Sequence, residues 1–191
     1  MNKKLDYLLG KRCTFLATYS GVRLKETGYS HKNGKIIPHF APVMELSHVL
    51  YCDNNHSLRL FADNFSINYT TQFARLGQLI SGEVISFNAR VSVHDNSKLF
   101  EQPRIEYRLL YPSSIAIKCS LVDQNRRYPM PTERNELIGF VMETNTDDYL
   151  AGGTFYKQGY VDKYDAWCDK QVKKRSAADQ SNAKRLTTSN N

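Results

Sequence analysis

The sequence lacks the features that mark several classes of protein. It has no run of about 18 apolar residues, so it predicts no membrane-spanning helix. Its basic N-terminus is not followed by a sustained apolar stretch, which favours a cytoplasmic protein over a secreted one. It contains no GxSxG, P-loop or HExxH motif, and the paired acids Asp147 and Asp148 have no neighbouring base or metal ligand. We therefore predict that the protein is not an enzyme.

Metal-binding and disulfide patterns are also missing. The four cysteines are scattered and form no CxxC pair, and the five histidines show no ligand spacing with cysteine or acid. Without an export signal, the cysteines are predicted to be reduced, buried thiols. The sequence predicts no metal and no cofactor.

The chain is rich in aromatic residues and carries a modest positive charge. Twelve tyrosines and nine phenylalanines in 191 residues favour β structure. The net charge is +7, and residues 168–191, with six basic and two acidic residues, contribute +4 of it. The other 167 residues, with 20 basic and 17 acidic, contribute only +3. Attraction to polyanions is plausible, but the total charge does not establish it.

Residues 57–93 carry the clearest periodic pattern. Apolar and polar residues alternate in Ser57–Ala62 and in Ile85–Val91, and the first segment places Leu58 and Leu60 on its buried face. A period of two predicts two strands, each with one buried face. Between these strands, apolar residues spaced three to four positions apart predict a helix.

Alternation predicts further strands on both sides of this stretch, over Cys13–Tyr19, Val43–Cys52, Ile105–Tyr111 and Ile115–Cys119. The turn residues 53–56 predict an antiparallel hairpin between the second and third strands. Residues 26–42 contain two glycines and two prolines and predict a long connection, with a hairpin at Asn33-Gly34 as the alternative.

The chain is expected to divide into four parts. We predict an N-terminal arm, a β-barrel, an aromatic-rich extension packed on the barrel, and a basic tail that is mostly disordered after a helix over 165–176. These parts cover residues 1–11, 12–120, 121–167 and 168–191.

The predicted order of three strands, a helix and two strands resembles the OB-fold. This fold is a mainly β, five-stranded Greek-key barrel with a helix between strands three and four. Gly82–Val91, with the sequence GEVISFNARV, is similar to the glycine–acid–apolar start of the fourth strand in many OB proteins. Glycine permits the tight turn that leaves the helix. The resemblance covers residues 12–120, about 57% of the chain, and leaves a C-terminal extension of helical or irregular structure.

The resemblance implies a binding site on the faces of strands two and three, gripped by the loops after strands one and four. Single-strand binding needs rings on which bases stack beside cations for phosphates. The residues that match by position are Tyr29, Lys32 and Lys35 on the first loop, Tyr51, Arg59 and Phe61 on the strands, and Lys98, Phe100 and Arg104 on the second loop.

Some of these residues also have a purely structural interpretation. Phe61 is placed on the outward face, opposite Leu58 and Leu60, but it would also fit beneath the first loop or the C-terminal segment. Lys98, Phe100 and Arg104 fit a solvated loop with a single anchoring ring. Two other charges, Arg90 and Lys118, fit ordinary outward positions. Arg108 would suit a phosphate contact, next to Tyr107, which fits the core equally well.

These observations predict a non-enzymatic, cytoplasmic protein that binds single-stranded nucleic acid with weak sequence preference. The alternative is a protein-interaction module, an accessory or inhibitor subunit, that presents the barrel face or residues 149–167 to a protein partner. A small basic chain without a catalytic motif fits both, because a fold does not fix a function. No membrane partner is expected.

Overall fold

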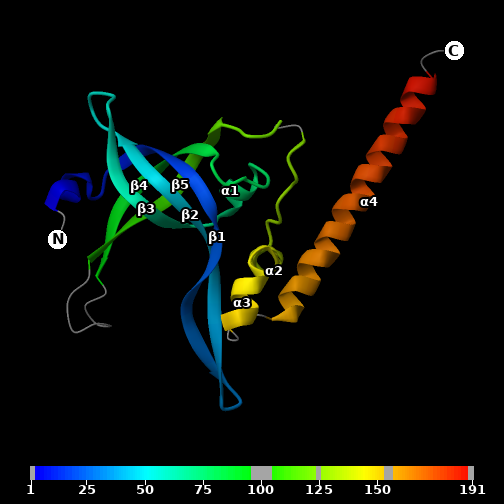
Figure 1. The fold of residues 1–191 in the computed structure, drawn as a ribbon, viewed down its shortest axis with the longest axis horizontal. Helices are drawn as coiled ribbons and strands as arrows, with labels where there is room; N and C mark the ends of the chain where they lie inside the picture. The colour runs from blue at the N-terminus through cyan, green and yellow to red at the C-terminus, as the bar shows by residue number, and fades with distance from the viewer. Residues whose placement is uncertain (1–2, 96–104, 124–125, 153–156, 189–191) are drawn as a thin grey trace. The chain divides into compact units, whose positions relative to one another are not determined.

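The computed structural model describes residues 3–95, 105–123, 126–152 and 157–188. The chain forms two compact units, residues 1–130 and 131–191. The first unit is mainly β and the second is helical (Figure 1). The elements of the first are η1 (Lys3–Leu8), β1 (Arg12–Lys32), β2 (Lys35–Cys52), β3 (Leu58–Asn68), α1 (Thr71–Ala74), β4 (Val84–Asp95) and β5 (Ile105–Cys119).

The five strands form one antiparallel sheet in the order β3-β2-β1-β4-β5. The sheet is not closed, because among the described residues no ladder joins the edge strands β3 and β5. The prediction of a mainly β fold is confirmed, and so is the hairpin of β2 and β3, whereas the closed barrel is not. The rings of Phe61 on β3 and Tyr107 on β5 nevertheless lie 6.1 Å apart between centroids, so the sheet curls until its edges approach.

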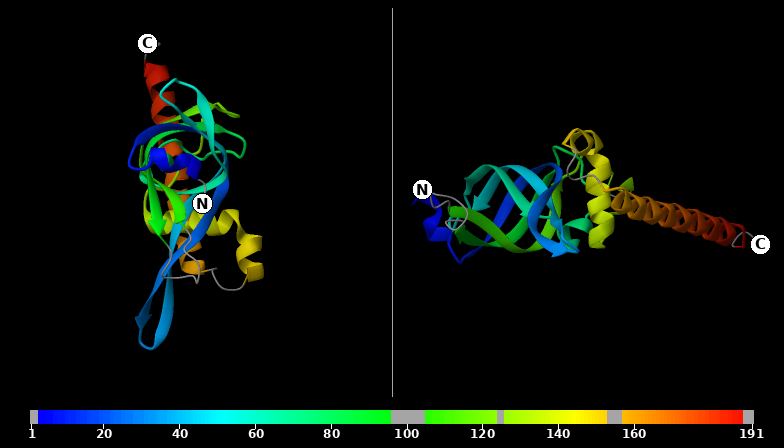
Figure 2. Two further views of the ribbon diagram at one scale, coloured as in Figure 1. Left: turned by 90° about the vertical axis from the view of Figure 1, so that its left-hand side faces the viewer. Right: turned by 90° about the horizontal axis from the view of Figure 1, so that it is seen from below.

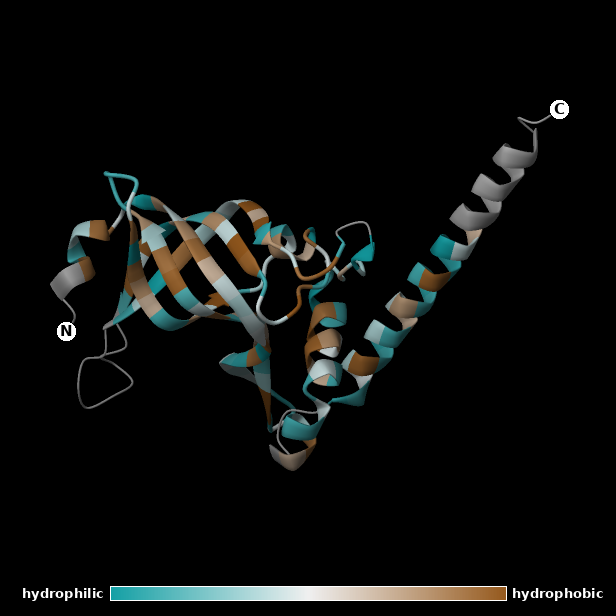
Figure 3. Ribbon diagram, turned by 45° about the horizontal axis from the view of Figure 1, so that its top comes forward, coloured by the Kyte–Doolittle hydropathy of each residue, from teal (hydrophilic) through white to brown (hydrophobic). Residues whose placement is uncertain are grey.

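Aromatic rings fill the concave side of this sheet. Phe15 on β1 stacks on Phe87 of β4 at 5.6 Å between ring centroids, and Phe73 of α1 meets Phe87 edge-on at 5.7 Å. All three side chains are fully buried. Figure 3 shows hydrophobic and hydrophilic residues alternating along the strands. Offset and edge-on ring pairs add about 0.5–1.5 kcal/mol each beyond their buried area, so these contacts are a main source of stability in this unit.

The predicted buried face of β3 was wrong. Leu58 and Leu60 are 54% and 52% exposed, whereas Phe61 is only 7% exposed. The register with β2 explains this, because Leu50 pairs with Leu60 and Val49 pairs with Ala62, which leaves Phe61 as an extra residue in a β-bulge. Such a bulge re-aims a side chain. Here the larger ring enters the core and the leucines face outward.

The predicted long connection over 26–42 is strand, as the alternative reading had it. β1 continues to Lys32, β2 begins at Lys35, and the chain turns at Asn33 and Gly34, with φ values of 51° and 72°. Two consecutive residues with positive φ are typical of the type I′ turn that suits a β-hairpin. A register shift between Tyr19 and Gly21 marks a β-bulge in β1.

The helix between β3 and β4 is shorter than the predicted pattern, because α1 covers only Thr71–Ala74. Gly82 has a φ of 96°, a conformation that side chains rarely adopt, and its N–H donates to the carbonyl of Tyr19 at 2.8 Å. The glycine predicted before the fourth strand is therefore required by its backbone conformation.

The second unit consists of α2 (Arg134–Thr144), α3 (Thr146–Gly152) and α4 (Gln158–Thr188). The apolar residues 137–142 of α2 are buried. Gly139 permits close packing of α2 on α4, because a Cβ there would lie 2.1 Å from the carbonyl oxygen of Tyr160. The rings of Phe140, Tyr164 and Trp167 pack in sequence, 5.6 and 5.9 Å apart.

Helix α4 extends further than the sequence indicated. The helix expected over 165–176 lies within it, but α4 continues to Thr188, through a segment that composition predicted to be disordered. None of the helices in the described part of the chain is long and apolar enough to cross a membrane.

Candidate nucleic-acid interface

The nine residues that the OB resemblance selects fall into three groups in the structure. Tyr51, Arg59 and Phe61 belong to the sheet, and Tyr29, Lys32 and Lys35 belong to the far end of the β1–β2 hairpin. Lys98, Phe100 and Arg104 lie outside the described residues. The structure therefore does not bring the first two groups together on one strand face.

The two rings expected on the strand face are buried. Tyr51 is 3% exposed, and its hydroxyl is hydrogen-bonded to that of Tyr7. Burial and this hydrogen bond raise the pKa of Tyr51 to about 12. Phe61 packs edge-on against Phe15 and Phe65, with centroids 5.3 and 5.5 Å away. Neither ring offers a free face to a base, so the outward placement of Phe61 was wrong.

Arg59 is exposed, but it is paired within its own hairpin. Its Nε donates to Oδ2 of Asp53 at 2.6 Å, and Asp53 also accepts hydrogen bonds from the N–H groups of Asn55 and Ser57 at 2.9 Å. The hydrogen bond from Arg59 and those from the backbone lower the pKa of Asp53. This arrangement fixes the turn between β2 and β3.

The far end of the β1–β2 hairpin is a two-stranded ribbon. β4 pairs with β1 only from Arg12 to Thr18, and β3 pairs with β2 only from Val43 to Cys52. Residues 24–42 therefore have no neighbouring strand on either side and project beyond the sheet (Figures 1 and 2). We call these residues the hairpin arm. The arm is mostly exposed around its turn, over residues 31–36, whereas Phe40 near its base is buried.

The hairpin arm combines exposed rings with exposed cations. Tyr29 is 63% exposed and meets the ring of His31 edge-on at 5.5 Å. Lys32 and Lys35 lie directly opposite each other beside the turn. The arm holds three lysines and a single glutamate, so it is locally basic. Rings beside cations are the combination that single-strand binding requires.

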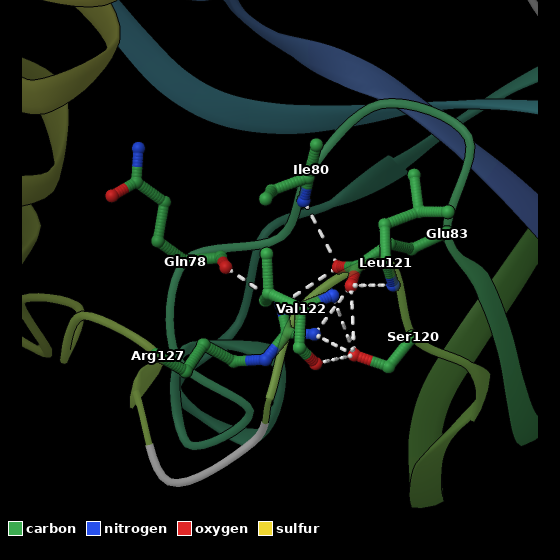
Figure 4. Close-up of polar contacts among 7 residues, drawn as sticks. All are labelled: Gln78, Ile80, Glu83, Ser120, Leu121, Val122 and Arg127. Atoms are coloured by element: carbon green, nitrogen blue, oxygen red, sulfur yellow. Dashed lines mark hydrogen bonds and ion pairs between the residues drawn. The ribbon is translucent and has the colours of Figure 1, made fainter.

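The most buried charge pair among the described residues holds the segment after β5 against the loop before β4. Glu83 is fully buried and Arg127 nearly so, and Nη2 of Arg127 pairs with Oε1 of Glu83 (Figure 4). Nη1 donates to Oε2 of Glu83 and to the carbonyl of Gln78, both at 2.7 Å. The carboxylate also accepts the Ile80 and Leu121 N–H groups at 2.9 and 3.0 Å.

These contacts determine the ionisation of Glu83. Burial alone would raise its pKa, but the hydrogen bonds from Arg127, Ile80, Leu121 and the hydroxyl of Ser120 outweigh burial and lower the pKa to about 2. The acid that opens the glycine–acid–apolar motif is therefore a structural anion. The sequence identified the motif, but its partner Arg127 lies 44 residues later and no local spacing indicated it.

The described residues contain no group of three or more histidine, cysteine or acidic side chains that would hold a metal ion. Comparisons of the chain with protein-family models, with curated proteins and with solved structures gave no match.

Proposed function

We propose that this protein binds single-stranded nucleic acid, with little sequence preference and without catalysing a reaction, through the hairpin arm. The observation that carries the proposal is the exposed combination of Tyr29, Lys32 and Lys35 on a ribbon that projects from the sheet. Any of the bases can stack on an aromatic ring, and lysines attract phosphates without recognising the bases, so this binding would show little sequence preference.

An OB-like fold is part of this proposal. The strands lie in the order β3-β2-β1-β4-β5, and α1 lies between β3 and β4 along the chain. An OB barrel has the same arrangement, with one more ladder that pairs β3 with β5 and closes the barrel. The contact between Phe61 and Tyr107 supports this interpretation, because it joins the two edge strands. In such a fold the arm is the loop after the first strand, which is one of the two gripping loops.

Like-charge pairing at the end of the arm also supports a bound polyanion. Lys32 and Lys35 face each other across the strands, and like charges in that position destabilise a ribbon. A phosphate placed between them would remove this repulsion. The free arm would therefore be more mobile than the bound arm.

Fluorescence anisotropy with a labelled oligothymidine of about 20 nucleotides, titrated at several salt concentrations, tests the proposal. The wild-type protein is expected to bind, with affinity that falls as salt rises. The Lys32→Gln/Lys35→Gln variant should lower the magnitude of the log–log salt slope by about 1.4, since each phosphate contact on a single strand contributes about 0.7. Tyr29→Ala should weaken binding about tenfold with little change in slope.

A variant with the same loss of charge elsewhere provides the control. Lys157 and Lys163 are exposed lysines of the helical unit, and Lys157→Gln/Lys163→Gln should leave the salt slope nearly unchanged. The proposal fails if the wild-type protein shows no binding at low salt, or if its affinity does not respond to salt.

A second function, protein interaction, is supported by a different surface. Leu16, Leu50 and Leu60 pair side by side across β1, β2 and β3 and face away from the core. Leu60 is 52% exposed, whereas Leu16 and Leu50 are half-buried. A row of apolar side chains that reaches the surface favours a protein partner. The Leu50→Ser/Leu60→Ser variant separates the two functions. If its oligonucleotide affinity is unchanged, the leucine row remains available as a surface for a protein partner. If its affinity is reduced, the leucine row contacts the nucleic acid.

A further inference from the structure

Three arginines gather on the outer surface of the other half of the sheet. Arg12 on β1 lies directly opposite Arg90 on β4. Arg108 on β5 is opposite Ser92, which is two residues from Arg90 on the same face. The alternating residues Val91 and Leu109 are buried, which places the arginines on the convex side. We call Arg12, Arg90 and Arg108 the arginine face.

This charge is not neutralised within the sheet. In the described part of the chain, none of the three arginines forms an ion pair with an acid. Glu106 is two positions from Arg108 on the same face, and no ion pair joins them. Like charges directly opposite each other on neighbouring strands are destabilising, so the pair of Arg12 and Arg90 lowers the stability of the free protein.

The edge strand β5 is distorted beside these arginines. Asn88 and Arg90 on β4 pair with Ser113 and Leu110, so β5 carries an extra residue there. Tyr111 lies in this bulge with a φ of 54° and is 70% exposed. Nη2 of Arg12 donates to the carbonyl oxygen of Tyr111 at 3.0 Å, which joins the bulge to the arginine face.

The like-charge pair of arginines and the bulge both cost stability, although Nη2 of Arg12 also donates hydrogen bonds to the carbonyl of Tyr111 and to Oγ of Ser113. A tyrosine with positive φ is strained by of order 1 kcal/mol, and strained residues cluster at binding sites. The bulge exposes a large ring next to an unneutralised cation. Rings and guanidinium groups together suit a ligand that offers phosphates and flat bases.

We propose that the arginine face, with Tyr111, is a second contact surface for the phosphodiester backbone of single-stranded nucleic acid. This inference depends on the proposed function, and it extends the contact from the hairpin arm to the β1–β4–β5 side of the same sheet. The arginines bind phosphates, so this surface contributes affinity and salt dependence rather than sequence preference.

The test compares Arg90→Gln/Arg108→Gln with a matched double variant. Arg75 and Arg126 are exposed arginines elsewhere in the same unit, and Arg75→Gln/Arg126→Gln removes the same charge. Anisotropy with the labelled oligothymidine should show about tenfold weaker binding for Arg90→Gln/Arg108→Gln at low salt, and a salt slope smaller by about 1.4. The matched variant should change affinity less than twofold.

Thermal unfolding without ligand gives an independent measurement. Arg90→Gln should raise the melting temperature by about 1–3 °C, because it removes the repulsion with Arg12. Weaker binding by a more stable protein cannot result from misfolding. A melting temperature that falls would contradict the account of this surface.

The outcomes separate the two proposals. If the wild-type protein binds and Arg90→Gln/Arg108→Gln binds equally well, the arginine face is overturned while the function of the hairpin arm stands. If Arg90→Gln/Arg108→Gln and Arg75→Gln/Arg126→Gln lose the same amount of oligonucleotide affinity, the arginine face is also overturned, because the total charge of the protein then explains binding. If the wild-type protein binds no oligonucleotide, the proposed function itself fails, and this inference fails with it.

Discussion

Two regions of the β unit use their charges in opposite ways. Around Glu83 and Arg127, both partners are buried and nearly every polar atom is hydrogen-bonded within the chain. On the hairpin arm, Lys32 and Lys35 face each other and solvent. A buried charge must be paired to be tolerated, whereas an exposed like-charge pair persists only because water and ions screen it.

This difference separates structural charge from charge that is available to a ligand. The Glu83–Arg127 pair is already satisfied, so its removal should cost stability. Among the described residues, the lysines of the arm and the arginines of the β1–β4–β5 surface form no ion pair with an acid. Their removal should cost binding and leave stability unchanged or improved.

The largest expected effect is on the buried pair. Arg127→Met leaves the Glu83 carboxylate buried without its main partner, and the free energy of unfolding should fall by about 3–5 kcal/mol in urea denaturation. Glu83→Gln/Arg127→Met should lose less, because both charges are gone and the amide oxygen still accepts the backbone N–H groups. Arg23→Gln is the matched control at the exposed pair with Glu45, whose side chains are 49% and 39% exposed, and it should cost under about 1 kcal/mol. If Arg127→Met and Arg23→Gln lower the free energy of unfolding by similar amounts, the distinction between the buried and the exposed ion pair is wrong.

Acid should weaken the same pair in a defined range of pH. The pKa of Glu83 is lowered from 4.5 to about 2 in the folded protein, so its contribution to stability is complete above pH 4.5. It is lost as the pH falls from there to about 2. The stability difference between wild type and Glu83→Gln, measured by thermal unfolding at pH 6, 4, 3 and 2, should therefore shrink through this range. A constant difference would show that the carboxylate does not titrate there.

A smaller effect distinguishes a core ring from a stacking ring. Phe61→Leu keeps an apolar side chain in the core but removes the ring contacts with Phe15, Phe65 and Tyr107. It should therefore cost about 1.5–3 kcal/mol in urea denaturation and leave oligonucleotide affinity unchanged. Tyr29→Ala on the arm should behave in the reverse way, with stability retained and affinity reduced. If the Phe61→Leu protein is fully folded but binds the oligonucleotide more weakly, Phe61 belongs to the binding surface after all.

Several parts of the fold could be read from the sequence because their signals are local. Alternation identified the strands around Ser57–Ala62 and Ile85–Val91, and the turn residues 53–56 identified the hairpin. Gly82 signalled its own backbone conformation. The resemblance of the element order to an OB-fold placed Tyr29 on a binding loop, and Tyr29 is exposed in the structure.

Other parts depended on contacts between distant residues. Both faces of β3 carry apolar side chains, so alternation alone could not decide which face is buried. The β2 register and the bulge at Phe61 made that choice. The opposition of Arg12 and Arg90 joins residues 78 positions apart, and nothing in either local sequence indicates it.

The sequence by itself determined that the first unit is mainly β, that the chain turns at 53–56 and that its charge is mildly basic, because these properties follow from neighbouring residues. Tertiary structure alone decided which rings are buried and which charges are neutralised. The physical reason is that burial and ion pairing are properties of strand register and of curvature, which bring residues together across the sheet. The same lysine or arginine is therefore a structural charge or a ligand contact according to what lies opposite it.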